Sequence, residues 1–562
     1  MYILGISAYY HDSTAVLIKD GIVLCAVEEE RFTRVKHDNS FPFQSVDFCL
    51  KSAGIMIKDI DAVAYYEKPL LKFERILETF VATYPFSLKP FVKGLPEWFD
   101  YKIKVGHTIK KKLKYKGPIY YVPHHLSHAS SSFYPSPFQE AAILTVDGVG
   151  ELQTTGLWYG KSTGITPLKS IDFPHSLGLL YSTFTAFLGF RVNEDEYKVM
   201  GLGAYGKPVL VHKVYKVIKV KDNGSFKLDL KYFSFREDFT MWSKHFEELF
   251  GKPRRPNEPV TKRHKDIAAS IQAVTEEIYF KMLNHLYTLI KSKNLCISGG
   301  VGLNALANGK IYDHTPFKHV YILGPSGDSG AALGSALYTY HTILGHKKRH
   351  EIRSLYLGSS YSDNQIELVL KRHHLRYEKI STKKELINRS AKLLADGKII
   401  GWFQGKMEFG PRALGARSIL SAPFPRAMKE KVNIIKRREQ FRPFAGSVLQ
   451  EKVDEYFEVP EKNYYSPFMN FCFKVKKDRQ KDLAAITHED GTCRIQTVNR
   501  DNGLYYELIK EFYRQTGIPC ILNTSFNVKG EPIVETPEQA INDFLKSKMG
   551  ILVIGSFIVQ KN

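Results

Sequence analysis

The amino-acid sequence predicts an α/β protein with at least two domains, and three observations support this prediction. The chain has 562 residues, whereas a single hydrophobic core rarely serves more than about 300 residues. A strand–turn–strand pattern at residues 2–30 recurs at residues 141–159, which indicates a duplicated architecture. At residues 294–304 a strand leads through a Gly-rich turn into a helix, an order typical of α/β folds.

The two strand units differ in their turns. In the first unit, Lys19-Asp20-Gly21 is typical of a tight hairpin between two apolar strands. In the second unit, the apolar strand that begins at Ala141 ends in Asp147 and the Gly-rich turn 148–150. We therefore expect the Asp147 carboxylate at the end of a buried strand, where it could serve as a metal ligand.

Residues 123–129 contain three histidines. If this segment forms a helix, His124 and His128 project from the same face about one turn apart. Two neutral imidazoles at this spacing can bind one divalent metal ion, although a pair on an exposed helix face has the same spacing. The nearby strand-end carboxylate of Asp147 favours the metal site.

Turns and periodicity organise the middle of the chain. Asp222-Asn223-Gly224 predicts a second hairpin within residues 214–230, and the prolines of residues 253–259 interrupt the chain after it. Apolar residues three or four positions apart then predict a long amphipathic helix, and these residues are Ile267, Ile271, Val274, Ile278 and Met282.

Two further turns carry candidate site residues. The glycines of the turn 299–302, followed by Asn304, allow a backbone to approach a phosphate or a nucleoside closely. Asp328 precedes a helix of small residues at 331–340, where it is either a helix cap or a third metal ligand. The polar stretch 341–354 predicts a domain boundary.

Beyond this boundary, cationic and short polar side chains gather in four segments. Arginine offers a planar fork that matches phosphate, and Ser, Thr and Asn can donate to the remaining oxygens. The cations form either an anion site or structural salt bridges with Glu408, Glu439 and Asp490. The four segments are 408–418, 436–444, 488–494 and 523–527.

Composition restricts the class of protein. The net charge of +22 is compatible with a nucleic-acid partner, yet the lysines are spread along the chain, which favours a solvated surface and sites for small anions. No apolar run approaches the roughly 20 residues that span a bilayer, and the N-terminus enters a strand without a basic leader. The six cysteines are scattered, so we expect reduced thiols and a cytoplasmic location.

Motifs from end to end of the chain carry a resemblance to a known family. They are 5–15, 28–37, 124–128, 196–202, 408–415, 441–445, 490–492 and 523–534. In sequence and in order, these motifs resemble those of the NodU/CmcH-type O-carbamoyltransferases.

The resemblance implies a fold and two linked reactions. Residues 1–350 would form a duplicated actin/hexokinase/Hsp70-like domain similar to Kae1, and residues 351–562 a YrdC-like α/β domain. The second domain would join the carbamoyl group of carbamoyl phosphate to ATP, and the first would pass it from carbamoyl adenylate to a hydroxyl of a sugar or natural product. The implied cofactors and co-substrates are ATP with Mg²⁺, carbamoyl phosphate, and Fe²⁺ or a similar divalent metal.

The resemblance also implies roles for individual residues. His124, His128 and Asp328 would hold the metal, with Asp147 as a further ligand. Catalysis would involve His11, Asp12 and Lys36, where His11 takes the acceptor's proton and Lys36 stabilises negative charge. The nucleotide and carbamoyl phosphate would be bound by Gly299, Gly300, Asn304, Arg412, Lys436, Arg442, Arg494, Asn523 and Ser525.

Three other functions share parts of this pattern. An enzyme that makes threonylcarbamoyl-adenosine in tRNA uses the same two domain types, but it would consume threonine and bicarbonate. A metal- and nucleotide-binding scaffold would release no pyrophosphate, and a sugar kinase would produce ADP. We expect a small-molecule hydroxyl acceptor, no nucleic acid and no membrane partner. The sequence leaves open the identity of the acceptor and the oligomeric state, a homo-oligomer included.

Overall fold

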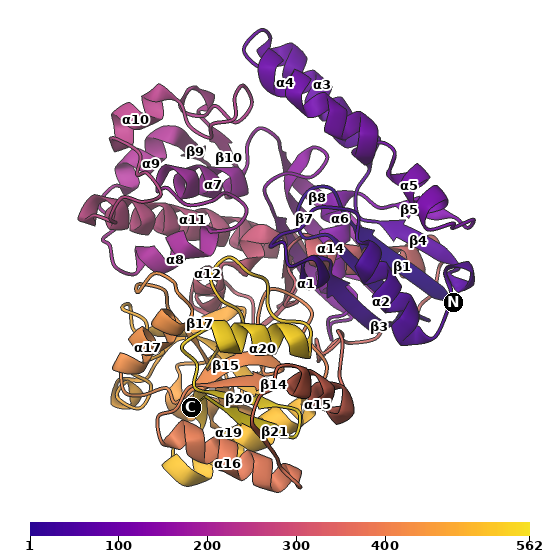
Figure 1. Cartoon of the computed structure of the whole chain (residues 1–562). Helices are drawn as coiled ribbons and strands as arrows, with labels where there is room; N and C mark the ends of the chain where they lie inside the picture. The colour runs from indigo at the N-terminus through magenta and orange to yellow at the C-terminus, as the bar shows by residue number, and fades with distance from the viewer. Residues whose placement is uncertain (562) are drawn as a thin grey trace. The chain divides into compact units, whose positions relative to one another are not determined.

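The computed structural model describes residues 1–561, which divide into two compact units (Figure 1). The first unit comprises Met1–Glu29, His37–Ala307 and Ile311–Ile352. The second unit comprises Glu30–Lys36, Asn308–Lys310 and the chain from Arg353 onward. Two short segments that precede Arg353 in the sequence thus belong to the second unit.

The first unit contains two sheets with the same topology. In the first sheet the strand order is β3-β2-β1-β4-β5, with β1, β2 and β3 antiparallel and β4 and β5 parallel to β1. In the second sheet the order is β8-β7-β6-β11-β12, with the same directions. The strands are β1 (Tyr2–Ser7), β2 (Thr14–Lys19), β3 (Ile22–Glu28), β4 (Ala62–Tyr65), β5 (Ile119–Tyr121), β6 (Glu140–Val146), β7 (Gln153–Lys161), β8 (Gly164–Asp172), β11 (Asn294–Ser298) and β12 (His319–Ile322).

This repeat confirms the predicted duplication and the actin/hexokinase-like fold class. Helices connect and cover the sheets, and α6 packs against α14. The helices of this unit are α2 (Phe43–Ala53), α3 (Pro69–Thr83), α4 (Leu88–Glu97), α5 (Val105–Lys112), α6 (His124–Phe133), α7 (Leu177–Phe187), α8 (Glu196–Gly203), α9 (Val211–Val217), α10 (Lys244–Phe250), α11 (Lys262–Ile290), α13 (Ile311–His314), α14 (Asp328–Tyr338) and the first three residues of α12 (Ala305–Gly309).

Most local predictions for this unit are confirmed, with two changes of boundary. The long helix α11 buries all five apolar residues that predicted it. The predicted hairpin within 214–230 is shorter, because Val214 belongs to α9 and only β9 (Ile218–Val220) and β10 (Phe226–Leu228) pair. The small-residue helix begins at Asp328, three residues before the predicted start.

The second unit is built on one mixed sheet with the order β13-β21-β20-β14-β15-β19-β16-β18-β17. Its strands are β13 (Tyr377–Lys379), β14 (Ile400–Phe403), β15 (Arg417–Ser421), β16 (Ala445–Leu449), β17 (Phe471–Lys474), β18 (Thr492–Val498), β19 (Cys520–Ser525), β20 (Ile551–Ile554) and β21 (Phe557–Gln560). Its helices are α1 (Glu30–Thr33), α15 (Asp363–Arg372), α16 (Lys383–Ala395), α17 (Ala427–Ile435), α18 (Val453–Tyr456), α19 (Leu504–Thr516) and α20 (Pro537–Lys546).

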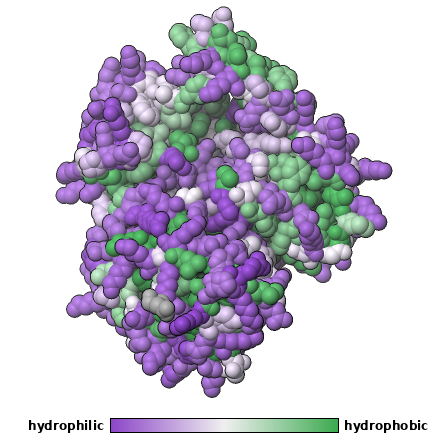
Figure 2. All heavy atoms as spheres, in the orientation of Figure 1, coloured by the Kyte–Doolittle hydropathy of each residue, from purple (hydrophilic) through white to green (hydrophobic). Residues whose placement is uncertain are grey.

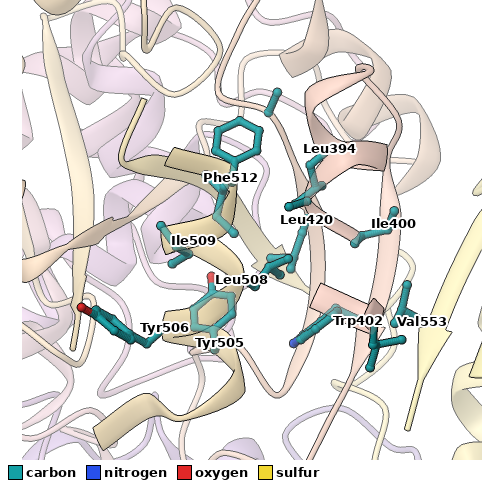
Figure 3. Close-up of a cluster of buried hydrophobic side chains, with 14 of the residues drawn as sticks. Leu394, Ile400, Trp402, Leu420, Tyr505, Tyr506, Leu508, Ile509, Phe512 and Val553 are labelled. Atoms are coloured by element: carbon teal, nitrogen blue, oxygen red, sulfur yellow. The ribbon is translucent and has the colours of Figure 1, made fainter. Parts of the chain in front are cut away.

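Helices cover both faces of this sheet, so the second unit is also α/β. On one face, Trp402 and Val553 pack with side chains of α16 and α19, part of which Figure 3 shows. On the other face, Phe403 and Leu552 pack with side chains of α15 and α20. Because successive strand residues point to opposite faces, neighbours such as Trp402 and Phe403 serve two separate cores. Among residues 1–561, no helix combines the length and apolarity needed to cross a bilayer.

Candidate metal centre and anion-binding residues

The histidine motif begins helix α6, and two of its three rings face each other. Both carboxylate oxygens of Glu151 accept the backbone N–H of His124 at 3.0 Å, which fixes the first turn of the helix. The Nε2 atoms of His124 and His128 are 3.1 Å apart. The middle ring, His125, points elsewhere and contacts Thr145 Oγ1 at 2.9 Å through Nδ1. The predicted spacing of the pair is thus confirmed.

Two carboxylates complete this cluster. Asp147, directly after β6, places Oδ2 3.1 Å from His124 Nε2 and 3.7 Å from His128 Nε2. Asp328, the first residue of α14, places Oδ1 3.7 Å and 3.6 Å from the same two nitrogens. The N-cap position of α14 is occupied by Gly327 and Asp328 is the first helical residue, so Asp328 is not the cap of this helix. All four side chains are buried, and their ligand atoms lie within 4.8 Å of one another.

The geometry of these four donors fits a divalent metal ion. Metal–ligand bonds of about 2.1 Å place neighbouring ligand atoms about 3.0–3.4 Å apart, close to the separations found here. The second oxygen of Asp328 is buried and has no hydrogen-bond partner within the described part of the chain. Burying carboxylates against imidazole lone pairs is costly unless a cation lies among them. Two imidazoles and two carboxylates suit Fe²⁺, Mn²⁺ or Zn²⁺.

Second-layer contacts hold two of these donors in place. The backbone N–H of Gly300 donates to Asp147 Oδ1 at 2.8 Å, which leaves Oδ2 directed at the histidines. Ser298 Oγ lies 3.4 Å from His128 Nδ1 and can accept a hydrogen bond from the Nδ1–H group, so that Nε2 carries the lone pair. Gly299 adopts a φ of 95°, and a Cβ there would lie 2.3 Å from Val146 O, so the turn requires glycine. The Gly-rich turn therefore orients a carboxylate of the cluster.

The electrostatics of the cluster favour a cation. Although burial opposes it, the carboxylates of Asp147 and Asp328 raise the pKa of His128 to about 9. Burial also opposes ionisation of Asp147, yet the two histidines hold the pKa of its carboxyl well below its usual range. Without a metal, a proton supplies the positive charge that these groups require.

A second cluster in the first unit joins His11, Asp12 and His37. Asp12 Oδ2 lies 2.8 Å from His11 Nδ1, and Asp12 Oδ1 lies 2.7 Å from His37 Nδ1. The two rings stack with their centroids 4.6 Å apart. His37 was not among the residues predicted from the sequence, although it ends the motif 28–37. Lys36, its neighbour in sequence, belongs to the second unit.

Both nitrogens of His11 face acceptors, since Nε2 contacts the carbonyl oxygen of Asn193. Only the protonated ring can donate to both partners. Burial favours the neutral ring, but the Asp12 carboxylate outweighs it and raises the pKa of His11 to about 10. His11 is therefore an imidazolium at neutral pH, which does not suit the predicted role as proton acceptor.

This raised pKa predicts a pH dependence of stability. Because the pKa of His11 rises from 6.5 to about 10 on folding, its ion pair stabilises the protein fully below pH 6.5 and is lost as the pH rises through 10. The difference in unfolding free energy between wild type and Asp12→Asn should thus shrink between neutral pH and pH 10, measured by urea denaturation. A difference that stays constant over this range would contradict the assignment.

Asn304 lies where the sequence placed it, after the Gly-rich turn, but its side chain is engaged in packing contacts. Its amide exchanges two hydrogen bonds of 3.1 Å with Gln272 of α11. Its Oδ1 also accepts the backbone N–H of Ala307 at 3.1 Å. These bonds fasten the turn to α11, and a contact of Gly299, Gly300 or Asn304 with a nucleotide stays a prediction.

In the second unit, strand register places three predicted residues on one face of the sheet. Asn523 in β19 pairs with Ala445, and Ala445 pairs with Arg494 in β18. Residues opposite each other in a ladder project from the same face, and so do residues two apart in one strand. Asn523, Ser525 and Arg494 therefore share a face. Asn523 is buried and donates to Ser447 Oγ at 3.1 Å and Ala413 O at 3.2 Å, so it also ties the sheet together.

Charged groups lie near Cys472, which pairs with Arg494 and shares its face of the sheet. Burial raises the pKa of the Cys472 thiol to about 12. Four nearby charged groups also influence this pKa: Arg494, Arg412 and Lys310 lower it, and Asp490 raises it. Three of these four groups are cations. The predicted phosphate ligands Arg412 and Arg494 are thus brought into one neighbourhood.

Lys436 is buried at the end of α17 and holds the loop after β19. Its Nζ donates to Asn527 Oδ1 at 2.8 Å, Asn527 O at 3.0 Å and Ser525 Oγ at 3.3 Å. Burial, together with the charges of Arg438 and Arg442, holds the pKa of this amine well below its ordinary value. Arg442 Nη1 lies 3.8 Å from Glu439 Oε2. Converging cations of this kind are stabilised by an anionic ligand.

Two charged residues in the Arg-rich motif 408–418 are structural. Glu408 Oε1 accepts the backbone N–H groups of Leu414 and Ala416 at 2.7 Å each. Arg417 is fully buried, stacks over Phe403 at 3.7 Å and donates to backbone carbonyls such as Gln404 O at 2.9 Å. The alternative of structural pairing thus holds for part of this segment, and Glu408 shapes the loop that carries Arg412.

Solved structures are only weakly similar to the first unit. Component A of (R)-2-hydroxyglutaryl-CoA dehydratase from Acidaminococcus fermentans has a TM-score of 0.35 and 16% identity, covering 61% of this chain and 99% of that chain. HypF from T. kodakarensis has a TM-score of 0.32 and 12% identity, covering 62% and 48%. The strand order described above, rather than these overlaps, establishes the fold.

Sequence comparisons are far more specific. The chain is 44% identical to the Synechocystis protein sll1178, covering 100% of this chain and 97% of the relative. It is 38% identical to the nodulation protein NolNO of Sinorhizobium fredii, covering 99% and 80%. Residues 2–337 match the family model described as carbamoyltransferase N-terminus, and residues 391–561 match the carbamoyltransferase C-terminus. The chain therefore belongs to the carbamoyltransferase family.

Proposed function

We propose that this carbamoyltransferase activates carbamoyl phosphate with ATP and transfers the carbamoyl group to a hydroxyl of a small-molecule acceptor, a sugar or natural product. The observation that carries the proposal is the buried cluster of His124, His128, Asp147 and Asp328 inside the segment matched by the N-terminal carbamoyltransferase model. A divalent cation held there suits the handling of a nucleotide-linked carbonyl group.

The proposed reaction consists of two half-reactions, formation of carbamoyl adenylate and transfer of its carbamoyl group. In residues 351–562, carbamoyl phosphate, ATP and water yield carbamoyl adenylate, pyrophosphate and inorganic phosphate, with Mg²⁺ accompanying ATP. In residues 1–350, the acceptor oxygen attacks the carbamoyl carbon and the bond from carbon to the adenylate oxygen breaks. AMP leaves with the bonding electrons, and the hydroxyl proton passes to a base.

The cationic residues of the second unit would hold the phosphates. Arg412 and Arg494 project guanidinium forks that match phosphate oxygens, and Arg442 lies close enough to Lys436 to lower the pKa of its amine. The proposal gives Lys436 a positioning role, because its amine already holds Ser525 and Asn527. That loop would present Ser525 to the ligand on the same face as Arg494 and Asn523.

In the first unit, the chain's own residues position the transfer. When bound, a divalent metal, Fe²⁺ or similar, would act as a Lewis acid toward an oxygen of the adenylate. Gly300 keeps Asp147 directed at the metal site, and the imidazolium of His11 offers a fixed positive charge for the developing negative charge. Gly299 and Asn304 would face the adenosine.

His37 is the better candidate for the base that takes the acceptor's proton. Its Nδ1 lies 2.7 Å from Asp12 Oδ1, so a neutral ring donates there and carries its lone pair on Nε2. A carboxylate that fixes the tautomer of a histidine is the arrangement used for general bases. Asp12 thus positions both rings through its two carboxylate oxygens.

Replacement of His37 by Asn separates this role from packing, because the Asn amide can still donate to Asp12. We expect kcat for carbamoyl transfer to fall by about 10²–10⁴-fold. The KM for the acceptor and the rate of pyrophosphate release should stay near the wild-type values. A variant with wild-type kcat would exclude His37 as the base.

The proposed function is tested with purified protein, ATP and carbamoyl phosphate. We expect pyrophosphate release that depends on carbamoyl phosphate, and a product heavier by one carbamoyl group when a panel of sugars, nucleosides and aminoglycosides is added. Production of ADP without pyrophosphate would instead indicate a kinase. Pyrophosphate release that depends on threonine and bicarbonate would indicate the tRNA-modifying reaction.

A further inference from the structure

Helices α3 and α4 form a hairpin within the first unit, and Figure 1 shows it standing out at the top. The rings of Phe80 and Phe91 stack with centroids 4.0 Å apart, while Phe73 meets Trp98 at 5.6 Å. Residues near the end of α3 therefore pair with residues near the start of α4, as in an antiparallel hairpin. These aromatic contacts form the inner face of the hairpin.

The outer half of the hairpin exposes a second set of large apolar side chains. Val81 and Phe86 are each 75% exposed, and Tyr84 at the connection is 62% exposed. Single exposed apolar residues are ordinary on soluble proteins, but a contiguous group indicates a binding surface. Figure 2 shows hydrophobic atoms gathered at the top, where Figure 1 draws the hairpin. We call this group the apolar tip; it comprises Leu77, Val81, Tyr84, Phe86, Leu88 and Val92.

Helical geometry places both halves of the apolar tip on one side. Leu77 and Val81 of α3 lie three residues before and one residue after the inner-face residue Phe80. Leu88 and Val92 of α4 lie at the same two positions relative to Phe91, so they are rotated from the inner face by the same angles. In an antiparallel pair, equal rotations from the shared face lead to the same side. The hairpin is therefore apolar on its inner face and along one outer side.

The surrounding sequence is strongly basic. Residues 68–118 contain twelve Lys or Arg and four Asp or Glu, a net charge of +8 within a chain whose net charge is +22. Lys110, Lys111 and Lys112 in α5 are exposed, as are Lys89 and Lys93 in α4. A second copy of the chain would bring a second charge of +8 against the first, which opposes self-association. The charge instead complements an anionic surface.

We propose that the apolar tip binds the surface of an anionic lipid bilayer. A projecting amphipathic hairpin can lay its apolar side about 5–10 Å into the boundary between headgroups and acyl chains. Tyr84 and Phe86 are of the aromatic class that prefers this boundary, and lysines near it are attracted to anionic headgroups. This contact is peripheral, and it revises the expectation from sequence that the protein has no membrane partner.

The test is flotation of the full-length protein with vesicles. We expect the wild type to float with vesicles that contain phosphatidylglycerol and to float less in high salt. With vesicles of phosphatidylcholine alone, the protein should remain in the bottom fraction. The double variant Val81→Ser/Phe86→Ser should bind anionic vesicles at least about tenfold more weakly. Because both side chains are 75% exposed in the free protein, this variant should fold normally, which circular dichroism checks.

The matched control is Leu368→Ser, which changes a 61% exposed apolar residue in α15 and should leave vesicle binding unchanged. Equal loss in both variants, or wild-type protein that does not float with anionic vesicles, overturns the proposal. Sedimentation velocity supplies the remaining outcome. A wild-type dimer that Val81→Ser/Phe86→Ser converts to a monomer, without vesicle binding, would assign the apolar tip to self-association.

Discussion

A His128→Ala variant is expected to lose its bound divalent metal and to transfer carbamoyl groups more than about a hundredfold more slowly than wild type. His128 Nε2 lies between 3.1 Å and 3.7 Å from the other three donor atoms, so alanine removes a quarter of the ligand set. It also leaves Asp147 and Asp328 facing each other with one imidazole fewer between them. Elemental analysis of the purified protein measures the metal, and the mass of the carbamoylated acceptor measures transfer.

Two comparisons make this result specific. His125→Gln alters the neighbouring buried histidine, whose ring contacts Thr145 rather than the cluster, and it should retain the metal. Pyrophosphate release from ATP and carbamoyl phosphate should persist in His128→Ala, because that half-reaction is assigned to the second unit. A His128→Ala protein that keeps both its metal and its transfer activity would remove the cluster from the mechanism.

An Arg494→Met variant should release pyrophosphate about 10²–10³-fold more slowly, the effect of losing one fixed donor to a charged transition state. The thioether chain keeps much of the volume of the side chain but loses the fork that binds phosphate. Arg494 shares the sheet face with Asn523 and Ser525. Arg494 and Arg412 are both close enough to Cys472 to lower the pKa of its thiol. A coupled assay of pyrophosphate measures the loss.

The controls distinguish ligand binding from general charge. Arg494→Lys keeps the positive charge without the planar fork and should lie between wild type and Arg494→Met. Arg389→Met removes a surface arginine that pairs with Glu378 in the same unit and should release pyrophosphate normally. Equal rates in Arg494→Met and Arg389→Met would show that Arg494 does not bind the phosphates.

The metal cluster illustrates what a sequence can predict. His124 and His128 are four residues apart, and Asp147 follows an apolar strand, so local periodicity alone predicted the face of the helix and the end of the strand. The role of Asp328 could not be decided in this way, because an aspartate near the start of a helix can either cap that helix or direct its carboxylate to another group. The pairing of β11 with β6 and the packing of α14 on α6 bring it to the histidines.

For other predicted site residues, the structure adds contacts that local sequence patterns do not reveal. Asn304 and Asn523 have the residue types expected of ligands, yet each is tied to neighbours from distant segments, Gln272 and Ser447. Sequence reasoning also chose His11 as the base without seeing that Asn193 O faces its second nitrogen. His37 was missed because its link to Asp12 spans 25 positions and follows no local period.

The sequence by itself determined the duplicated α/β architecture, the family, the histidine pair and the arginine-rich segments, since these depend on order and spacing along the chain. Only the tertiary structure decided which carboxylates meet the histidines, which polar side chains are used for packing, and which apolar residues of the α3–α4 hairpin stay exposed. The reason is that spacing fixes neighbours within one helix or strand, whereas burial and ligand geometry depend on the segments that pack against it.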